Sequence, residues 1–302
     1  MAKVDAEKAM EVGAVLVEAI QMARGLVKPG NRLADVADAA EKFLKDKGYG
    51  IAFPMNISIN EQAAHYTPSI GDGKSFSATD LVKIDFGAEK EGTLSDCAVT
   101  VDLSGKYASL VEAANEALDS AISVVKAGVT VNEIGRVIAK AIESRGFKPI
   151  MNLGGHGIGE HDLHAEPFIP NYDNKDDTKL EEGMMIAIEP FATTGKGMVV
   201  DSDVREIYGY VEGGSVRSAD ARLVLREVEA KYSKEPFAVR WLSGVMDSKF
   251  RLYAAIGELV RYGAIEPYPT LVEVSKGAVS QAEAQLIVEK EGCKVITKID
   301  QR

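Results

Sequence analysis

Three of the chain's four histidines lie within nine positions, in the stretch GGHGIGEHDLHAEP at residues 154–167. Clustered imidazoles can bind one metal ion together or carry separate tasks. His156 lies in what reads as a glycine-rich loop that could bring its ring to a metal. His164 is eight positions further on and would share a face with His156 in an extended segment, whereas His161 would face away. We therefore expect His161 to be a loop or surface residue without a catalytic role.

Two aspartates lie in LVKIDFGAEKEGTLSDCAVTV, which predicts two strands joined by a four-residue loop at 89–92. That loop would set Asp85 directly opposite Asp96 on one side of the ribbon. Like charges so placed need a positive partner, for which a divalent cation is suited. Alternatively, a bulge breaks the register and both are ordinary surface acids. The hairpin alone favours this second interpretation.

Two glutamates strengthen the metal hypothesis. Glu189 ends the strongly apolar run MMIAIEPF, where an unpaired acid would be costly, and Glu283 directly precedes another apolar run. Together with the two aspartates and His156 they form a carboxylate-rich set suited to hard or borderline divalent ions. Bridging carboxylates commonly hold two such ions.

Two similar segments would position these side chains. Amphipathic helices are predicted at 8–26 and from after Gly30 to Gly48, and again at 108–125 and before Gly146. Six positions repeat at an offset of 98 residues: Val27, Lys28, Gly30, Lys42, Gly48 and Tyr49 match Val125, Lys126, Gly128, Lys140, Gly146 and Phe147. The repeat indicates an internal duplication, although two Ala-rich helices can also resemble each other by chance. A duplication predicts one α/β (α+β) domain of two similar halves with a site between them.

Strands are predicted at 51–59, 81–88, 93–103, 184–192, 285–290 and 293–299. Between Phe191 and Tyr268 the composition changes, with charge-rich segments at 218–233 and 247–265 that are predicted to be helical. This part of the chain is interpreted as an insertion. The sequence therefore predicts a catalytic domain formed by residues 1–191 and 268–302, with a helical subdomain at 192–267.

Composition limits the function classes. The chain has 302 residues, 46% of them hydrophobic and 27% charged, and a formal net charge of -11. Broad binding to nucleic acid or anionic membranes is disfavoured, because those surfaces would repel an acidic protein. Two cysteines cannot form a disulfide framework, and no signal peptide or membrane-spanning run is evident. We expect a cytoplasmic monomer.

Written in order, the motifs resemble the methionine aminopeptidases, in particular the type II branch in its short archaeal form. The matching segments are FPMNISINEQAAHYTP, KIDFG, LSDCAVTV, GGHGIGEHDLH, AIEPFATTGKG and EPYPTLVEV. The spacing of 94 positions from Glu189 to Glu283 favours type II over type I. The resemblance implies the pita-bread fold, two internally duplicated α/β half-domains, with the inserted segment as a helical subdomain.

The resemblance also implies a dinuclear site for two divalent ions, which could be Co, Mn, Fe or Zn. Asp85 would bind one ion, and His156 and Glu189 the other. Asp96 and Glu283 would bridge the two.

Further roles follow from the same resemblance. Glu189 would guide the proton, His65 would lie near the leaving amide nitrogen, and His164 near the scissile carbonyl oxygen. The methionine side chain would be held by positions that are equally compatible with plain core packing: Phe53, Leu163, Phe191 and Tyr268.

One departure lies beside the last predicted ligand. The family usually has a bulky aromatic before this glutamate and a histidine and a threonine after it, whereas this chain has Ala282, Ala284 and Gln285. On a strand, Gln285 shares the face of Glu283 and Ala284 points away. The surroundings of the ligand, and hence metal affinity, are expected to differ.

The predicted function is removal of the initiator methionine from nascent polypeptides, with a transient ribosome contact left open. One alternative is an Xaa-Pro aminopeptidase or prolidase, which normally carries an additional amino-terminal domain, whereas the first helix here starts within ten residues of Met1. The other is a non-catalytic binding protein on the same fold, which would be expected to have lost ligands.

Overall fold

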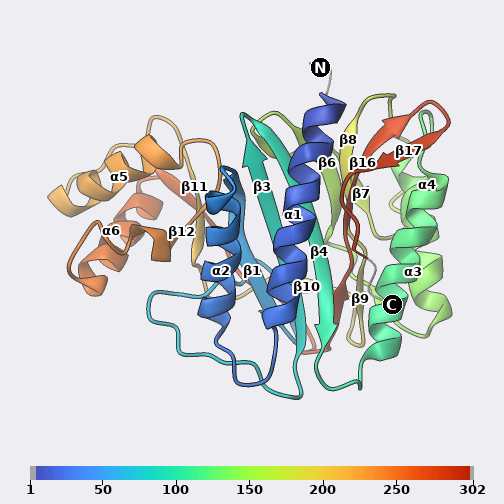
Figure 1. Ribbon diagram of the computed structural model, residues 1–302, viewed down its shortest axis with the longest axis horizontal. Coiled ribbons are helices and arrows are strands. Elements are labelled where there is room, and N and C mark those ends of the chain that lie inside the picture. The colour runs from blue at the N-terminus through green and yellow to red at the C-terminus, as the bar shows by residue number, and fades with distance from the viewer. Residues whose placement is uncertain (1–4, 300–302) are drawn as a thin grey trace.

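The first half of the molecule is a three-stranded antiparallel sheet covered on one face by two helices (Figure 1). The computed structural model describes residues 5–299. The elements of this half are α1 (Ala6–Leu26), α2 (Leu33–Asp46), β1 (Gly50–Ile59), β3 (Leu81–Lys90) and β4 (Thr93–Asp102), with the strand order β1-β3-β4. Leu16, Leu44, Met55 and Phe86 are fully buried between the helices and the sheet. The apolar faces of both layers thus form one core.

The second half repeats the plan with a larger sheet. Its helices are α3 (Ala108–Val124) and α4 (Val131–Ser144). Its five-stranded sheet has the order β17-β16-β8-β6-β7, from β6 (Gly154–Gly159), β7 (Asp162–Pro170), β8 (Met185–Ile188), β16 (Ala284–Glu289) and β17 (Gly292–Val295). A small sheet adds β5 (Lys148–Pro149), β9 (Phe191–Thr193) and β15 (Val279–Gln281). Within the described residues, no helix combines the length and the apolar character needed to cross a membrane.

The predicted duplication is confirmed by the helix boundaries. Helix α1 ends at Leu26 and α3 at Val124, and α2 and α4 start and end at the same offset of 98 residues. Both helix pairs also end in the same way, since Gly48 after α2 and Gly146 after α4 each have φ +81°. This left-handed conformation after a helix is the one that glycine adopts at little cost.

The segment between β9 and the last strands forms its own small core. Helices α5 (Ala219–Lys231) and α6 (Lys249–Arg261), both predicted, pack beside a sheet of order β12-β11-β13. Those strands, which the sequence did not predict, are β11 (Ile207–Tyr210), β12 (Phe237–Ala238) and β13 (Ile265–Tyr268), and a 3₁₀ turn spans Val239–Leu242. In Figure 1 this part lies at the opposite end of the molecule from α3 and α4.

One short strand of that segment belongs to another sheet. Strand β10 (Val199–Asp201) pairs with β14 (Leu271–Glu273), which pairs with β2 (Gln62–Ala64). The boundary at 192–267 therefore stays a prediction, and the ends of the predicted catalytic domain at 1–4 and 300–302 lie outside the described residues.

The predicted hairpin register is wrong by two residues. The turn consists of Glu91 and Gly92 alone, with φ of 50° and 85°, which suits a tight two-residue hairpin turn. Asp85 consequently lies opposite Ala98, and Asp96 opposite Gly87. Both aspartates still lie on one side of the ribbon, but diagonally, because the shift is an even number of residues.

A buried ion pair fixes the inserted segment to the first half. Arg240 pairs with Glu41 of α2, and its Nη1 donates to Thr67 Oγ1 over 2.6 Å. Trp241 Nε1 donates to the other oxygen of Glu41 over 2.8 Å. Burial raises the pKa of Glu41, and the positive charge of Arg240 opposes that rise. The pair therefore depends on the guanidinium staying in place.

We expect Glu41→Gln to lower the free energy of unfolding by about 3 kcal/mol, because it removes the only buried anion that pairs with the Arg240 guanidinium among the described residues. Asp38→Asn is the matched control, since Asp38 is exposed and 3.6 Å from Nε of Arg240; it should change stability by less than about 0.5 kcal/mol. Urea denaturation of the two variants measures both values. Equal effects would show that burial of the Glu41 pair contributes nothing.

Candidate metal centre

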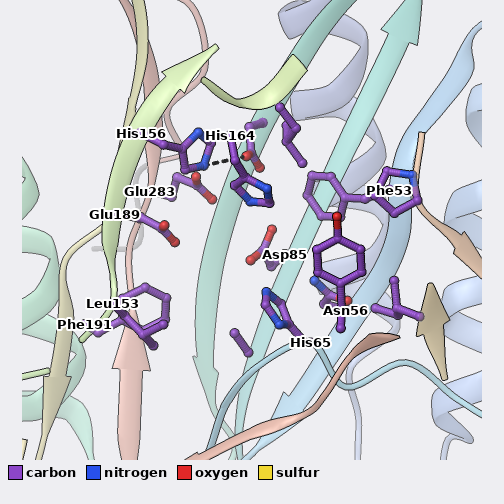
Figure 2. A pocket seen from close by; sticks show the side chains of 16 residues that line it. Phe53, Asn56, His65, Asp85, Leu153, His156, His164, Glu189, Phe191 and Glu283 are labelled. Atoms are coloured by element: carbon purple, nitrogen blue, oxygen red, sulfur yellow. Dashed lines mark ion pairs between the residues drawn. The ribbon is translucent and has the colours of Figure 1, made fainter. Parts of the chain in front are cut away.

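The five side chains predicted as metal ligands meet where the two halves join (Figure 2). Their ligand atoms fall into two groups, each within 4.8 Å: Asp96 with His156 and Glu283, and Asp85 with Glu189 and Glu283. Glu283 belongs to both groups. Glu189 lies with Asp85, whereas the family resemblance assigns it to the same ion as His156.

This is an unfavourable concentration of acids for a protein interior. Burial raises the pKa of Asp85 to about 6, and burial together with the neighbouring carboxylates raises the pKa of Asp96, Glu189 and Glu283 well above the usual range. One oxygen each of Asp85, Asp96 and Glu283 is buried without a hydrogen-bond partner. Buried acceptors of this kind are costly unless a cation lies between them.

His156 is prepared to bind through Nε2. Its Nδ1 lies 3.0 Å from the carbonyl oxygen of Gly157, so Nδ1 carries the proton, and its Nε2 lies 3.6 Å from Oδ2 of Asp96. Burial, together with a smaller contribution from the nearby His164, lowers the pKa of His156 to about 4. The ring is therefore neutral at neutral pH, as a ligand must be.

The stretch around His156 is a strand, and the prediction of a glycine-rich loop is wrong. It forms β6, a central strand that pairs with β7 and β8. A Cβ at Gly154 or Gly155 would lie 2.3 Å from the carbonyl oxygen of Ile169 or 2.1 Å from that of Ala187. The glycines thus serve close strand packing rather than loop flexibility.

His164 reaches the site by a hairpin, and not along one extended segment as the sequence suggested. Glu160 and His161 form the turn between β6 and β7, which brings the rings of His156 and His164 to 4.7 Å centroid separation. Burial lowers the pKa of His164, so its ring is neutral too. His161 points elsewhere, with Nδ1 2.5 Å from Glu235 Oε1.

Gln281 is a site residue that sequence reasoning missed. Its buried amide Nε2 donates to Asp85 Oδ2 over 3.0 Å and to Glu189 Oε2 over 3.2 Å. It thereby holds together two carboxylates that would otherwise repel each other. The available signal was position: Gln281 is two residues before Glu283 and shares its side of an extended segment.

Gln285 and Thr297 fasten the ligand-bearing strands to each other. Gln285 Oε1 accepts from Ser95 Oγ over 2.7 Å and from the backbone N–H of Asp96 over 3.0 Å, and its Nε2 donates to the Leu94 carbonyl oxygen over 3.1 Å. Thr297 Oγ1 donates to the carbonyl oxygen of Asp96 over 2.7 Å. The departure beside Glu283 therefore gives β16 a polar anchor on β4.

The centre opens into a small cavity of about 70 Å³. Besides the four acids and His156, its lining includes His65, His164 and all four residues predicted for a side-chain pocket: Phe53, Leu163, Phe191 and Tyr268. Room for the Phe53 ring depends on Gly87, where a Cβ would lie 2.4 Å from that ring.

His65 combines two unusual properties. It has φ +63°, which is rare outside glycine, and its Nδ1 is buried without a partner. Burial lowers the pKa of His65 to about 4, with a further contribution from His164. A neutral imidazole with a free nitrogen thus borders the cavity.

Five further lining residues were not predicted. These are Asn56, Ala64, Leu153, Ile207 and Pro236. Asn56 Oδ1 is buried and unpartnered, and Asn56 is the strand partner of Asp85. Ile207 and Pro236 come from the inserted segment, which therefore completes the cavity.

This donor set fits a divalent metal. Four carboxylates and one neutral imidazole offer oxygen and nitrogen ligands, three carboxylate oxygens lack any other partner, and the raised pKa values show that the groups lack a compensating charge. The apolar neighbouring walls can hold an organic side chain.

Comparisons with known proteins agree with this chemistry. Residues 6–225 match the family described as Metallopeptidase family M24. A methionine aminopeptidase from Archaeoglobus fulgidus is 46% identical over 292 residues, which cover 97% of this chain and 98% of that protein.

Solved structures share the fold. The structure of a thermophilic Arx1 superposes with a TM-score of 0.84 at 15% identity, covering 98% of this chain and 91% of that chain. A methionine aminopeptidase from Thermotoga maritima gives a TM-score of 0.72 at 23% identity and covers 99% of both chains. The predicted pita-bread fold is thus confirmed.

We expect Mn²⁺ binding to weaken by about tenfold or more between pH 7.5 and pH 5.5, because protons compete for carboxylates whose pKa values are raised. The sign follows from Asp85: below about pH 6 the metal-free carboxyl holds a proton that an ion must displace. The metal-induced rise in Tm should shrink over the same range.

Isothermal titration calorimetry at the two pH values measures this dependence. Asp96→Asn should abolish the metal-induced rise in Tm, whereas Asp176→Asn, an exposed control, should leave it intact. Binding that is independent of pH would contradict the assignment of these acids.

We expect Gln285→Leu to cost about 2–3 kcal/mol of stability, because two donors and one acceptor lose their buried partner. Metal affinity should fall about tenfold as Asp96 loses its support. Ser95→Ala removes only one of these hydrogen bonds and should have a clearly smaller effect on both measurements. Equal effects of the two variants would refute the anchoring role of Gln285.

Proposed function

The chain belongs to metallopeptidase family M24, and from that premise we propose that it removes the initiator methionine from nascent polypeptides as a metal-dependent aminopeptidase. The observation that carries the proposal is the convergence of four buried acids and a neutral histidine beside a small apolar cavity. This arrangement offers a place for metal, peptide bond and side chain together.

Divalent metal binding follows from the family, and we propose two ions, of Co, Mn, Fe or Zn. Asp85, Asp96, His156, Glu189 and Glu283 would hold them, with Glu283 common to both groups. When bound, such ions supply Lewis acidity, which polarises a peptide carbonyl and acidifies water. Other features of the reaction belong to the chain's own side chains.

Three of those side chains would act on substrate and protons. Glu189, whose pKa is raised by burial and by the neighbouring Asp85 and Asp96, would take and return the proton on a carboxylate oxygen. His164 would donate to the scissile carbonyl oxygen as a neutral imidazole. His65, with a free Nδ1, would hydrogen-bond the leaving amide nitrogen.

The apolar side of the cavity would hold the methionine side chain. Its walls are supplied by four elements: Phe53 from β1, Leu163 from β7, Phe191 from β9 and Tyr268 from β13. Burial of an unbranched apolar side chain in such a pocket would be favourable, whereas a charged side chain would lose its hydration without gaining a partner.

We further propose that residues 192–267 form an inserted subdomain whose separate core supports the cavity wall. The protein would act as a cytoplasmic monomer on nascent chains. Its net charge of -11 disfavours nucleic acid as a partner, apart from a transient contact at the ribosome.

The experiment is a peptide panel. Purified protein reconstituted with Mn²⁺, Fe²⁺ or Co²⁺ should release methionine from Met-Ala peptides, and Asp96→Ala should lower kcat/KM by at least about 10³-fold, because it removes a metal ligand. Release measured by mass spectrometry decides the assignment. No cleavage with any metal would refute the enzyme, and preference for Xaa-Pro peptides would identify a proline-directed peptidase instead.

A further inference from the structure

A polar contact joins the β6–β7 hairpin to the inserted segment across the cavity rim. His161 Nδ1 donates to Glu235 Oε1 over 2.5 Å, and the two side chains are 25% and 20% exposed. Among residues 5–299, this is the sole hydrogen bond or ion pair between the hairpin and residues 202–268. The hairpin and the inserted segment, which each supply a wall of the cavity, are therefore joined by this single polar contact, called the tie below.

The hairpin side of this tie is held rigidly. His161 has φ +51°, an uncommon conformation for a histidine, and its backbone N–H donates to the carbonyl oxygen of Gly92 over 3.0 Å. A Cβ at Gly92 would lie 3.0 Å from the His161 ring, so the absence of a side chain at residue 92 leaves room for the imidazole. The β3–β4 turn thus orients the imidazole toward Glu235.

Both ends of the tie lead directly into the cavity lining. Leu163 and His164 follow His161 on β7, and Pro236 follows Glu235. Strand β12 then continues from Pro236 and pairs with β11 at Ile207, another lining residue. Moving either end of the tie would therefore move a wall of the cavity.

We propose that the His161–Glu235 pair is a clasp that sets the width of the methionine pocket, and that both are positioning residues for substrate selection. The inference rests on the proposed function for the identity of the substrate. The clasp keeps Leu163 and Pro236 at a fixed separation, so that an unbranched side chain packs against both walls. Without it the walls separate and contact with methionine is lost.

An ordinary surface pair would not have this effect. Exposed ion pairs contribute little because water screens them and both side chains stay mobile. Here both groups are three-quarters or more buried, and the backbone of His161 is fixed by a hydrogen bond to a second hairpin. The geometry is thus prepared before a substrate binds.

The test compares Glu235→Leu, which removes the acceptor at similar size, and His161→Asn in the metal-loaded enzyme. Asparagine tolerates a positive φ but is too short to reach Glu235, so the turn is preserved. KM for Met-Ala-Ser should rise about fivefold in each variant while kcat stays within about twofold, as expected when uniform binding is lost. The preference for Met-Ala-Ser over Leu-Ala-Ser should fall.

Two further variants separate a clasp from a general disturbance. The double variant H161N/E235L should match the single variants, because the same contact is removed. Exchanging the pair, with His161→Glu and Glu235→His, should recover part of the affinity, since Glu91 shows that a glutamate accepts φ 50° in the equivalent turn. Glu160→Gln, in the same turn and exposed, is the control and should retain the KM of the unmodified chain.

Hydrogen exchange gives a readout that does not depend on turnover. Peptides covering 160–166 and 233–238 should exchange faster in Glu235→Leu, with the rest of the chain unchanged. Unaltered exchange and unaltered KM in both single variants would overturn the clasp, as would a double variant whose rise in KM is the product of the single effects. If the unmodified enzyme cleaves no Met peptide, the proposed function fails, and exchange still tests the clasp.

Discussion

Burial of four carboxyl groups in one place is the constraint on which the rest of the structure depends. Burial raises the pKa values of Asp85, Asp96, Glu189 and Glu283, and repulsion from neighbouring carboxylates adds to the rise in the last three. In a protein interior this arrangement persists only where other parts of the fold enforce it and a cation can neutralise it. Stabilising interactions elsewhere in the fold must therefore offset the free-energy cost of burying these four acids.

The enforcing structure is the junction between the duplicated halves. Each half has its own helix pair and its own core, so each can hold one ligand-bearing sheet independently. Gln281, Gln285 and Thr297 then connect the sheets by hydrogen bonds that include two ligand side chains and the backbone of a third. A duplicated fold therefore places a shared site at its junction, where each half supplies only part of the donor set.

The inserted segment contributes to the cavity wall rather than to the ligand set. None of the five acid and imidazole ligands lies between Tyr208 and Ile265, yet Pro236 and the neighbouring Ile207 and Tyr268 line the cavity. The segment is fixed to the first half through Glu41 and Arg240. Its separate core supports the side chains that it contributes to the cavity wall.

The sequence by itself determined the features that depend on neighbouring residues. Helix periodicity, the 98-residue repeat, the paired helix-ending glycines such as Gly48, and the identity of the acids were all readable, because each is governed by a short stretch of chain. Only the tertiary structure decided which groups meet. The grouping of Asp85 with Glu189, the part played by Gln281 and the contact of His161 with Glu235 join positions 74 to 196 residues apart. The predicted register of the β3–β4 hairpin was also wrong, because the observed register depends on a two-residue turn in which Glu91 has a positive φ. Such pairings are set by packing and turn geometry, which residue types and spacing do not encode locally.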